Sequence, residues 1–277
     1  MVDRTFRNYR ESFTGTDEDD SAEFYDGAGT IDMGDGDDWV WVSDPVDLID
    51  MGDGQDSLMA FDDVDEIDMG DGDDWIYLLT TGNSSNTDDA TNIEVLDLGA
   101  GDDKIRSLDL TGTIDFLDAG SGNDTISIDE AIDVDLGTGD DVFSADYVSD
   151  LDAGDGKDEV TLVEGAGTID MGDGNDDLTI TGPISGEIDL GDGHDTFEYI
   201  LASDDTATNF YVDGGDGSDT LILTLGDDWD VSVSSGTITL TNDDTGESAD
   251  ISYDNLENLI VESYDDPGVQ TDIYILM

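Results

Sequence analysis

The stretch Ile31-Asp32-Met33-Gly34-Asp35-Gly36-Asp37-Asp38-Trp39-Val40 decides the fold. It combines two glycines one residue apart with an aspartate that stands two positions after the second glycine. Glycine adopts positive φ without a steric penalty, so Gly34 and Gly36 predict a tight turn. The segment that follows, Trp39-Val40-Trp41-Val42, is rich in aromatic and β-branched residues and is typical of a strand. We therefore interpret the stretch as a turn that leads into a β-strand.

The same pattern recurs ten times with a period of about 18 residues. Repetition at a short period is the signature of a solenoid, in which each coil packs only on its neighbours. Longer intervals indicate insertions near residues 80 to 90 and 203 to 209, and we expect the first of them to interrupt the stacking of the turns. The copies begin at Ile31, Ile49, Ile67, Leu96, Leu117, Val134, Leu151, Ile169, Ile188 and Val212.

Each unit also contains a second, simpler half. In the segment from Val42 to Asp50, Asp47 and Ile49 stand nine residues after Asp38 and Val40, but the glycine pair is missing. Each coil is therefore predicted to have one turn that can hold a metal ion and one plain turn.

The composition excludes several classes of protein. The 277 residues include 75 acidic residues, 6 Lys and Arg, 1 His and no Cys, for a formal net charge of -69. So few basic residues argue against nucleic-acid binding, and no run of about 18 apolar residues predicts a membrane span. Disulfides, a thiol nucleophile and a zinc site of Cys ligands are excluded with the missing cysteines. Such a charge usually predicts disorder, but the strict register of the repeats predicts a chain that folds when cations neutralise it.

The repeats resemble the nonapeptide G-G-x-G-x-D-x-U-x of RTX proteins, the hemolysin-type calcium-binding repeat, over roughly residues 15 to 225. The resemblance implies an all-β fold, a right-handed parallel β-roll or β-helix solenoid with a small C-terminal β cap. A full match is the copy with Gly214, Gly215, Gly217, Asp219 and Leu221. Elsewhere the first glycine is replaced by Met33, Met51, Met69, Leu98, Ala119, Leu136, Ala153, Met171 and Leu190.

Calcium is the cofactor that the repeats favour, with up to about ten ions, because it takes 6 to 8 oxygen ligands in flexible geometry. In the family the ions lie between the turns of successive coils. The aspartates after the glycine pairs, here called the turn aspartates, are the first candidate ligands: Asp38, Asp56, Asp74, Asp103, Asp124, Asp141, Asp158, Asp176, Asp195 and Asp219. A second set, the pre-turn aspartates, are either ligands or solubilising residues at strand ends: Asp32, Asp50, Asp68, Asp97, Asp118, Asp135, Asp152, Asp170, Asp189 and Asp213.

The two ends of the chain differ from the repeats. We expect an N-terminal arm and opening coil in residues 1–30, the calcium-binding roll in 31–225, a β cap in 226–264 and a tail in 265–277. Arg4, Arg7 and Arg10 are predicted to pair with the protein's own acidic coil. The segment from Trp229 to Leu240 predicts a hairpin. The terminal Asp272-Ile273-Tyr274-Ile275-Leu276-Met277 resembles the uncleaved type I secretion signal of the family, with a plain apolar tail as the alternative.

Isolated features add no catalytic site. Trp39 and Trp75 hold the same place in their repeats, which predicts packing on the strand face, with a sugar-stacking stripe as the alternative. His194 reads as a variable turn residue. No separate catalytic domain fits in the chain, and Lys104, Arg106 and Lys157 do not form the basic cluster that a polysaccharide lyase would need. We therefore expect no enzyme and no catalytic residues.

The sequence predicts an extracellular calcium-binding protein, structural or surface-associated, that folds on binding calcium. Its expected partners are calcium ions, and self-assembly or a role as a cell-surface component is a further expectation. We expect neither nucleic-acid binding nor a membrane span. The alternative is a polysaccharide-binding accessory module of an extracellular enzyme system. A third hypothesis, a merely acidic protein of a salt-loving organism, predicts folding in monovalent salt alone.

Overall fold

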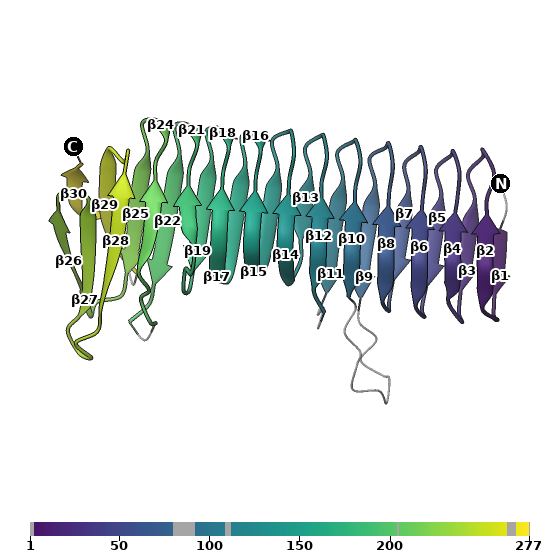
Figure 1. The fold of residues 1–277 in the computed structure, drawn as a ribbon, viewed down its shortest axis with the longest axis horizontal. Coiled ribbons are helices and arrows are strands. Elements are labelled where there is room, and N and C mark those ends of the chain that lie inside the picture. The colour runs from purple at the N-terminus through teal and green to yellow at the C-terminus, as the bar shows by residue number, and fades with distance from the viewer. Residues whose placement is uncertain (1–2, 80–91, 109–111, 204, 265–269, 277) are drawn as a thin grey trace. The chain divides into compact units, whose positions relative to one another are not determined.

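The computed structural model describes residues 3–79, 92–108, 112–203, 205–264 and 270–276. Over these residues the chain is a parallel β-solenoid, and none of them lies in a helix (Figure 1). Accordingly, the described residues contain no helix that is long and apolar enough to cross a membrane. The chain forms two compact units, Met1–Ala145 and Asp146–Met277. The insertion predicted near residues 80 to 90 lies outside the described residues.

The first unit contains two rows of parallel strands, each strand paired with the equivalent strand of the next coil. One row, the pre-turn row, consists of β2 (Arg10–Thr14), β4 (Ala28–Asp32), β6 (Val46–Asp50), β8 (Val64–Asp68), β10 (Ile93–Asp97), β12 (Ile114–Asp118) and β14 (Glu130–Asp135). The other, the post-turn row, consists of β1 (Asp3–Phe6), β3 (Ser21–Phe24), β5 (Trp39–Val42), β7 (Ser57–Ala60), β9 (Trp75–Leu79), β11 (Lys104–Leu108), β13 (Thr125–Ser127) and the start of β15 (Val142–Asp152).

The second unit continues the same pattern and ends in antiparallel strands. Its pre-turn row contains the end of β17 (Glu159–Asp170), β20 (Glu187–Asp189), β23 (Phe210–Asp213) and β28 (Ser248–Asp254). Its post-turn row contains the start of β17, β19 (Asp177–Thr181), β22 (Thr196–Leu201), β25 (Thr220–Leu225) and β29 (Asn258–Ser263). The glycine turns pair with one another through β16 (Asp155–Gly156), β18 (Asp173–Gly174), β21 (Asp192–Gly193) and β24 (Asp216–Gly217).

The cap consists of a hairpin and a terminal strand. β26 (Trp229–Ser234) pairs antiparallel with β27 (Thr237–Asn242), which confirms the predicted hairpin, and β27 pairs antiparallel with β28. β30 (Gln270–Ile275) pairs antiparallel with β29. An exposed edge of a parallel row would offer unpaired N–H and C=O groups, and these strands cover it.

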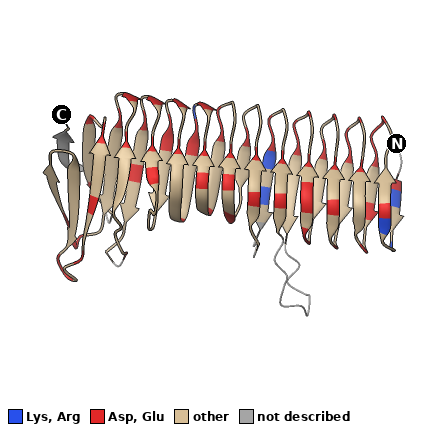
Figure 2. Ribbon diagram, in the orientation of Figure 1, with Lys and Arg blue, Asp and Glu red and all other residues tan. Residues whose placement is uncertain are grey.

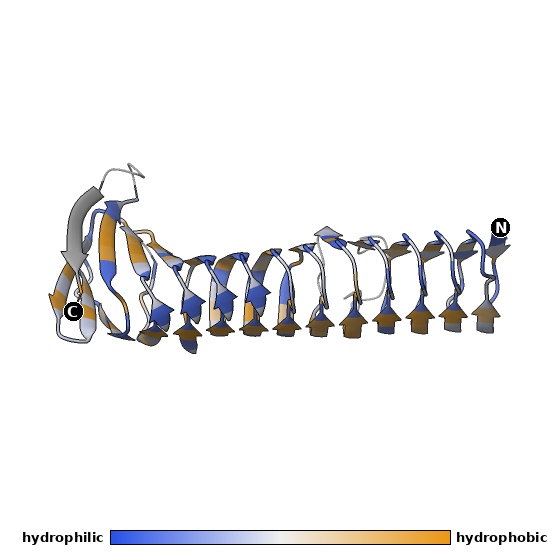
Figure 3. Cartoon of the chain, turned by 90° about the horizontal axis from the view of Figure 1, so that it is seen from above, coloured by the Kyte–Doolittle hydropathy of each residue, from blue (hydrophilic) through white to orange (hydrophobic). Residues whose placement is uncertain are grey.

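The core lies between the two rows of each unit and follows from the alternation of the strands. In the first unit Ile49 of β6 and Leu58 of β7 are buried in the core. Their neighbours in the strands, such as Leu48 and Ser57, are partly exposed and point outward. Figure 3 shows the connecting turns as mainly hydrophilic. Stacked coils thereby bury a continuous row of apolar side chains that no single coil could shield from water.

The residues that replace the first glycine of the RTX pattern belong to the core. Met33, Met51 and Met69 are completely buried, as are Leu98 and Leu136. Their side chains fill the interior at the point where the chain enters the glycine turn. Each of these residues therefore adds apolar contact to its own coil.

The second and fourth positions of the pattern require glycine for a steric reason. Gly52 has a φ of 93°, and a Cβ atom on it would overlap the carbonyl oxygen of Gly34 in the preceding coil. The turns can therefore stack at strand spacing only because their backbones approach without side chains between them.

The expected interruption of the stacking before Leu96 is wrong. β10 pairs with β8 in register, with Leu96 opposite Ile67, although 29 residues separate the two positions. An insertion at the plain turn leaves both rows intact because pairing depends only on the strands, and surface loops tolerate added length at low entropic cost.

The three N-terminal arginines lie over aromatic rings, a contact that the sequence did not reveal. The guanidinium carbon of Arg7 is 4.6 Å from the ring centre of Tyr25, and that of Arg10 is 4.7 Å from the ring centre of Phe6. Arg4 lies over Phe13 at 5.7 Å. The contact of Arg7 with Tyr25 joins the N-terminal segment to the next coil, to which β1 and β2 also pair through β3 and β4.

Replacement of Met51 by Ala should lower the free energy of unfolding of the calcium-loaded protein by about 2–5 kcal/mol, because the change leaves a cavity in the core. Replacement by Leu conserves volume and should cost less than about 1.5 kcal/mol. Urea unfolding at a fixed calcium concentration measures both values. Equal losses for the two variants would show that Met51 does not fill the core.

Candidate metal sites along the glycine turns

The ten turn aspartates lie in the buried layer directly beneath the glycine turns. Each follows the glycine pair, at the start of a strand of the post-turn row, and its side chain points inward instead of toward solvent. All ten are at most 2% exposed: Asp38, Asp56, Asp74, Asp103, Asp124, Asp141, Asp158, Asp176, Asp195 and Asp219. Burial of a carboxylate is costly unless it is paired, hydrogen-bonded or bound to a metal.

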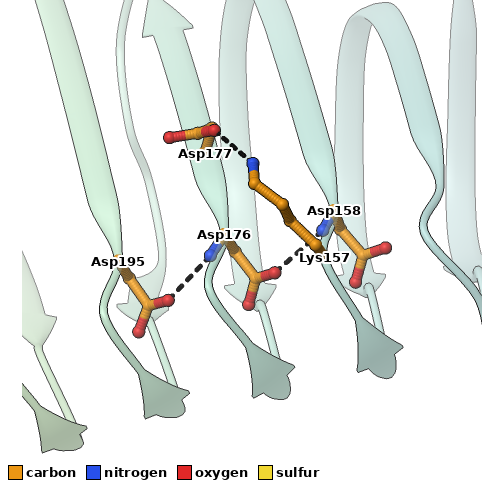
Figure 4. Close-up of polar contacts among 5 residues, drawn as sticks. All are labelled: Lys157, Asp158, Asp176, Asp177 and Asp195. Carbon is orange, nitrogen blue, oxygen red and sulfur yellow. Dashed lines mark hydrogen bonds and ion pairs between the residues drawn. The ribbon is translucent and has the colours of Figure 1, made fainter.

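In nine of the turn aspartates, one carboxylate oxygen accepts a hydrogen bond from the preceding coil of the same unit. In the first unit the backbone N–H of Asp38 donates to Oδ1 of Asp56 at 2.7 Å, and the N–H of Asp56 donates to Oδ1 of Asp74 at 2.7 Å. In the second unit the N–H of Asp158 donates to Oδ1 of Asp176, and that of Asp176 to Oδ1 of Asp195, both at 2.8 Å (Figure 4). The aspartates thus form a continuous hydrogen-bonded row within each unit.

In eight of these aspartates the second carboxylate oxygen has no such donor. Within the described part of the chain, eight of the buried Oδ2 atoms accept no hydrogen bond: those of Asp38, Asp56, Asp74, Asp103, Asp124, Asp176, Asp195 and Asp219. A buried charged oxygen without a partner costs at least about 1–3 kcal/mol. A single unpaired oxygen could be a local exception to the rule that buried polar atoms are hydrogen-bonded. Eight of them in equivalent positions are what a row of bound cations would require.

Burial raises the pKa values of these carboxyl groups. The pKa of Asp56 rises to about 8, mainly because burial disfavours the charged form, although the hydrogen bond from Asp38 lowers it. For the same main reason the pKa of Asp103 rises to about 7 and those of Asp74 and Asp124 to about 6. Without a cation, the row of buried carboxylates opposes its own ionisation at neutral pH.

The pre-turn aspartates occupy a different position. They end the strands of the pre-turn row, none of them is buried, and neighbouring coils place them opposite one another, as Asp50 is opposite Asp68. Some close the turn locally: Oδ1 of Asp97 accepts the N–H of Gly99 at 3.0 Å, and Asp189 bonds in the same way to Gly191. Burial and the carboxylate of Asp32 raise the pKa of Asp50. These residues therefore lie beside the turns, partly exposed to solvent.

The two sets of aspartates do not converge into side-chain clusters. Over the residues that the structure describes, no group of three or more His, Cys, Asp or Glu side chains is arranged to hold a metal ion. A calcium site on a glycine turn would therefore need backbone carbonyl oxygens in addition to carboxylates, which glycine turns offer.

In each unit the hydrogen-bonded row of turn aspartates continues to one further acidic residue that the repeat pattern missed. Asp20 is buried, and its N–H donates to Oδ1 of Asp38 at 2.6 Å, while its own Oδ2 accepts from the N–H and Oγ1 of Thr16 at 2.8 and 2.9 Å. At the other end Glu257 accepts the N–H of Asp219 at 2.8 Å. The spacing of 18 residues before Asp38 identifies Asp20, but Glu257 follows no glycine pair and only the fold reveals it.

The outer edge of the turns carries exposed and variable residues. His194 is exposed in its turn, in line with its predicted role as a variable residue. Lys157 forms an ion pair with Asp177, with 2.6 Å between Nζ and Oδ2 (Figure 4). Both side chains are more than half exposed, so the pair contributes little to stability.

Comparison with known proteins supports the fold. No protein-family model matches the chain, and no curated protein matches it. Among solved structures it is similar to a hyperactive, Ca2+-dependent, β-helical antifreeze protein from an Antarctic bacterium, with a TM-score of 0.57 and 23% identity over 82% of this chain and 81% of the other. At this level of identity the similarity establishes a shared β-helical fold.

Replacement of Asp56 by Asn should raise the calcium concentration at the midpoint of binding by about tenfold, because calcium affinity depends on the number of charged ligands. The amide oxygen can still accept the N–H of Asp38. The matched control is Asp65→Asn, which removes the same charge from an exposed position of β8. Calcium titration followed by calorimetry compares them, and equal shifts in the two variants would contradict a site at Asp56.

The metal-free protein should be more stable in acid. An aspartate pKa raised from its ordinary 3.8 to about 6 in Asp38 and about 8 in Asp56 means that the folded state binds protons more tightly than the unfolded state. Its stabilising effect is complete below about pH 4 and is lost as the pH rises through about 6 to 8. Circular dichroism of calcium-depleted protein should therefore show more β structure at about pH 5 than at about pH 8. Calcium should reverse this trend, because it favours the charged carboxylates.

Proposed function

We propose that this protein is an extracellular, RTX-like calcium-binding solenoid that folds when calcium binds and serves a structural or surface-associated role. The observation that carries the proposal is the row of buried turn aspartates in each unit. In Asp56 and Asp176, for example, Oδ1 accepts an N–H from the preceding coil and Oδ2 is buried without a hydrogen-bond donor. No Lys, Arg or His is among the buried residues that the structure describes, so we assign the compensating charge to a hard divalent cation.

We assign the ions to the glycine turns between successive coils, up to about ten in number. The turn aspartates supply the charged oxygens, and backbone carbonyls of the turns complete the 6 to 8 ligands that calcium takes. The pre-turn aspartates close the turns and contribute further negative charge beside each ion. This division of roles accounts for the burial of one set of aspartates and the exposure of the other.

Calcium binding supplies the stability that the acidic chain lacks. A site whose calcium concentration is about ten times its dissociation constant stabilises the folded state by about 1.4 kcal/mol. Several such sites together match the roughly 5–15 kcal/mol stability of an ordinary domain. The ions also reduce the repulsion within a chain of net charge -69.

The similar antifreeze protein supports calcium dependence, since it combines a β-helical fold with a requirement for Ca2+. The assignment to the RTX class rests on the repeat motif, because no family model matches. A protein of this kind suits the cell exterior, where calcium is plentiful. In the calcium-poor cytosol the chain would stay unfolded and its C-terminal segment, which forms β30 in the folded state, would be free to serve as a type I secretion signal.

A structural role fits the arrangement of the carboxylates better than catalysis. The turn aspartates are sealed beneath the turns, where no substrate reaches them. The ten equivalent positions also repeat one geometry along the chain, whereas an active site would single out one coil.

Removal of calcium should expand the chain and abolish its β structure, because the buried carboxylates then repel one another. Circular dichroism and small-angle scattering with a chelator and with calcium at neutral pH measure the change. Sodium chloride at matched ionic strength is the control, since a merely acidic protein of a salt-loving organism would fold in it without calcium. A compact β-rich chain in chelator at low salt would contradict the proposal.

A further inference from the structure

The outward face of the post-turn row in the first unit, from β5 to β13, differs from the pre-turn row of the same unit. The five strands β5, β7, β9, β11 and β13 contain no aspartate or glutamate. In the pre-turn row of the same unit, all of β6, β8, β10, β12 and β14 carry outward acidic side chains. The chain has 75 acidic residues, yet these five strands, which are neighbours in the row, contain no Asp or Glu. Their outward surface is here called the acid-free face.

The acid-free face carries aromatic rings and positive charge. Trp75 of β9 is 43% exposed, and its ring is stacked beside that of Tyr77 with centres 6.3 Å apart. In-register pairing places Lys104 next to Trp75 and Arg106 next to Tyr77 on the adjoining strand β11. Figure 2 shows β11 as one of the few places where basic residues lie on the strands.

These cations are available to a ligand. Nζ of Lys104 lies 4.9 Å from the ring centre of Trp75, and Arg106 is exposed. Neither forms an ion pair with a carboxylate of the described residues, in contrast to Lys157, which pairs with Asp177.

A shallow hollow of about 230 Å³ lies on the same face. Trp75, Tyr77, Lys104 and Arg106 line it, together with the hydroxyl-bearing Thr125 and Ser127 of β13. Its volume lies below the roughly 300–1,000 Å³ of pockets for drug-sized ligands, so it suits a single ring that is part of a longer chain. A ring surface, two cations and two hydroxyl groups match a sugar that bears a negative charge.

We infer that the acid-free face binds a carboxylated saccharide of the uronate class. The apolar face of the sugar ring stacks on the exposed part of Trp75, and the planar carboxylate is held by Arg106, whose guanidinium fork matches its shape, with Lys104 beside it. Thr125 and Ser127 bond to the ring hydroxyls.

The test measures binding of the calcium-loaded protein to a short oligogalacturonate by calorimetry, with a neutral galactose oligomer as the ligand control. Trp75→Ala should weaken binding by about tenfold, and Trp75→Phe by less, because a ring is retained. The double variant Lys104→Gln and Arg106→Gln should weaken it by about fivefold or more and remove its dependence on salt.

Two control variants separate this face from general effects. Lys157→Gln removes a positive charge elsewhere, and Tyr264→Ala removes a ring that is 45% exposed in the second unit, so both should bind as the unaltered protein does. Circular dichroism in calcium verifies the fold of each variant, which keeps failure of this inference distinct from failure of calcium-dependent folding. Absence of binding, equal binding of the neutral oligomer, tighter binding of a sulfated oligomer, or binding unchanged in the Trp75 and double variants would overturn it.

Discussion

The buried carboxylate of each turn aspartate is the constraint on which the rest of the structure depends. In Asp56, for example, Oδ1 accepts the backbone N–H of Asp38 in the preceding coil, which fixes the register between coils, and Oδ2 is buried without a hydrogen-bond donor. The hydrogen bond to the carboxylate aligns the coils. The buried negative charge opposes their packing as long as no cation or proton neutralises it. A cation removes the conflict, and so would a proton, which is why burial raises the pKa of Asp56 to about 8.

The glycine turns and the core follow from this arrangement. Gly52 must lack a side chain because the turn of the preceding coil lies directly against it. The residue before it, Met51, turns inward and is fully buried. In nine of the ten copies a Met, Leu or Ala stands at this position and is buried, so it adds apolar contact to its coil.

The distribution of acidic residues separates the surfaces of the first unit. The pre-turn strands expose carboxylates, whereas the strands from β5 to β13 expose aromatic, hydroxyl and basic side chains. Strand pairing brings residues 29 positions apart, such as Trp75 and Lys104, side by side. The expected packing of Trp75 on the strand face agrees with its contact with Tyr77, and 43% of the residue is exposed to solvent.

The sequence by itself determined the solenoid and its one-sided glycine turns, because a strict short period allows only one repeated conformation. That Met33 fills the core was known only from the structure. The hairpin of β26 and β27 was likewise predicted from its turn residues and from the alternation of apolar and polar residues in its strands. Only the tertiary structure decided three other features. The stacking continues across the long insertion before Leu96, Glu257 completes the row after Asp219, and Trp75, Tyr77, Lys104 and Arg106 form one surface. Each of these depends on which strands lie side by side, and the length of a loop between two strands does not specify that.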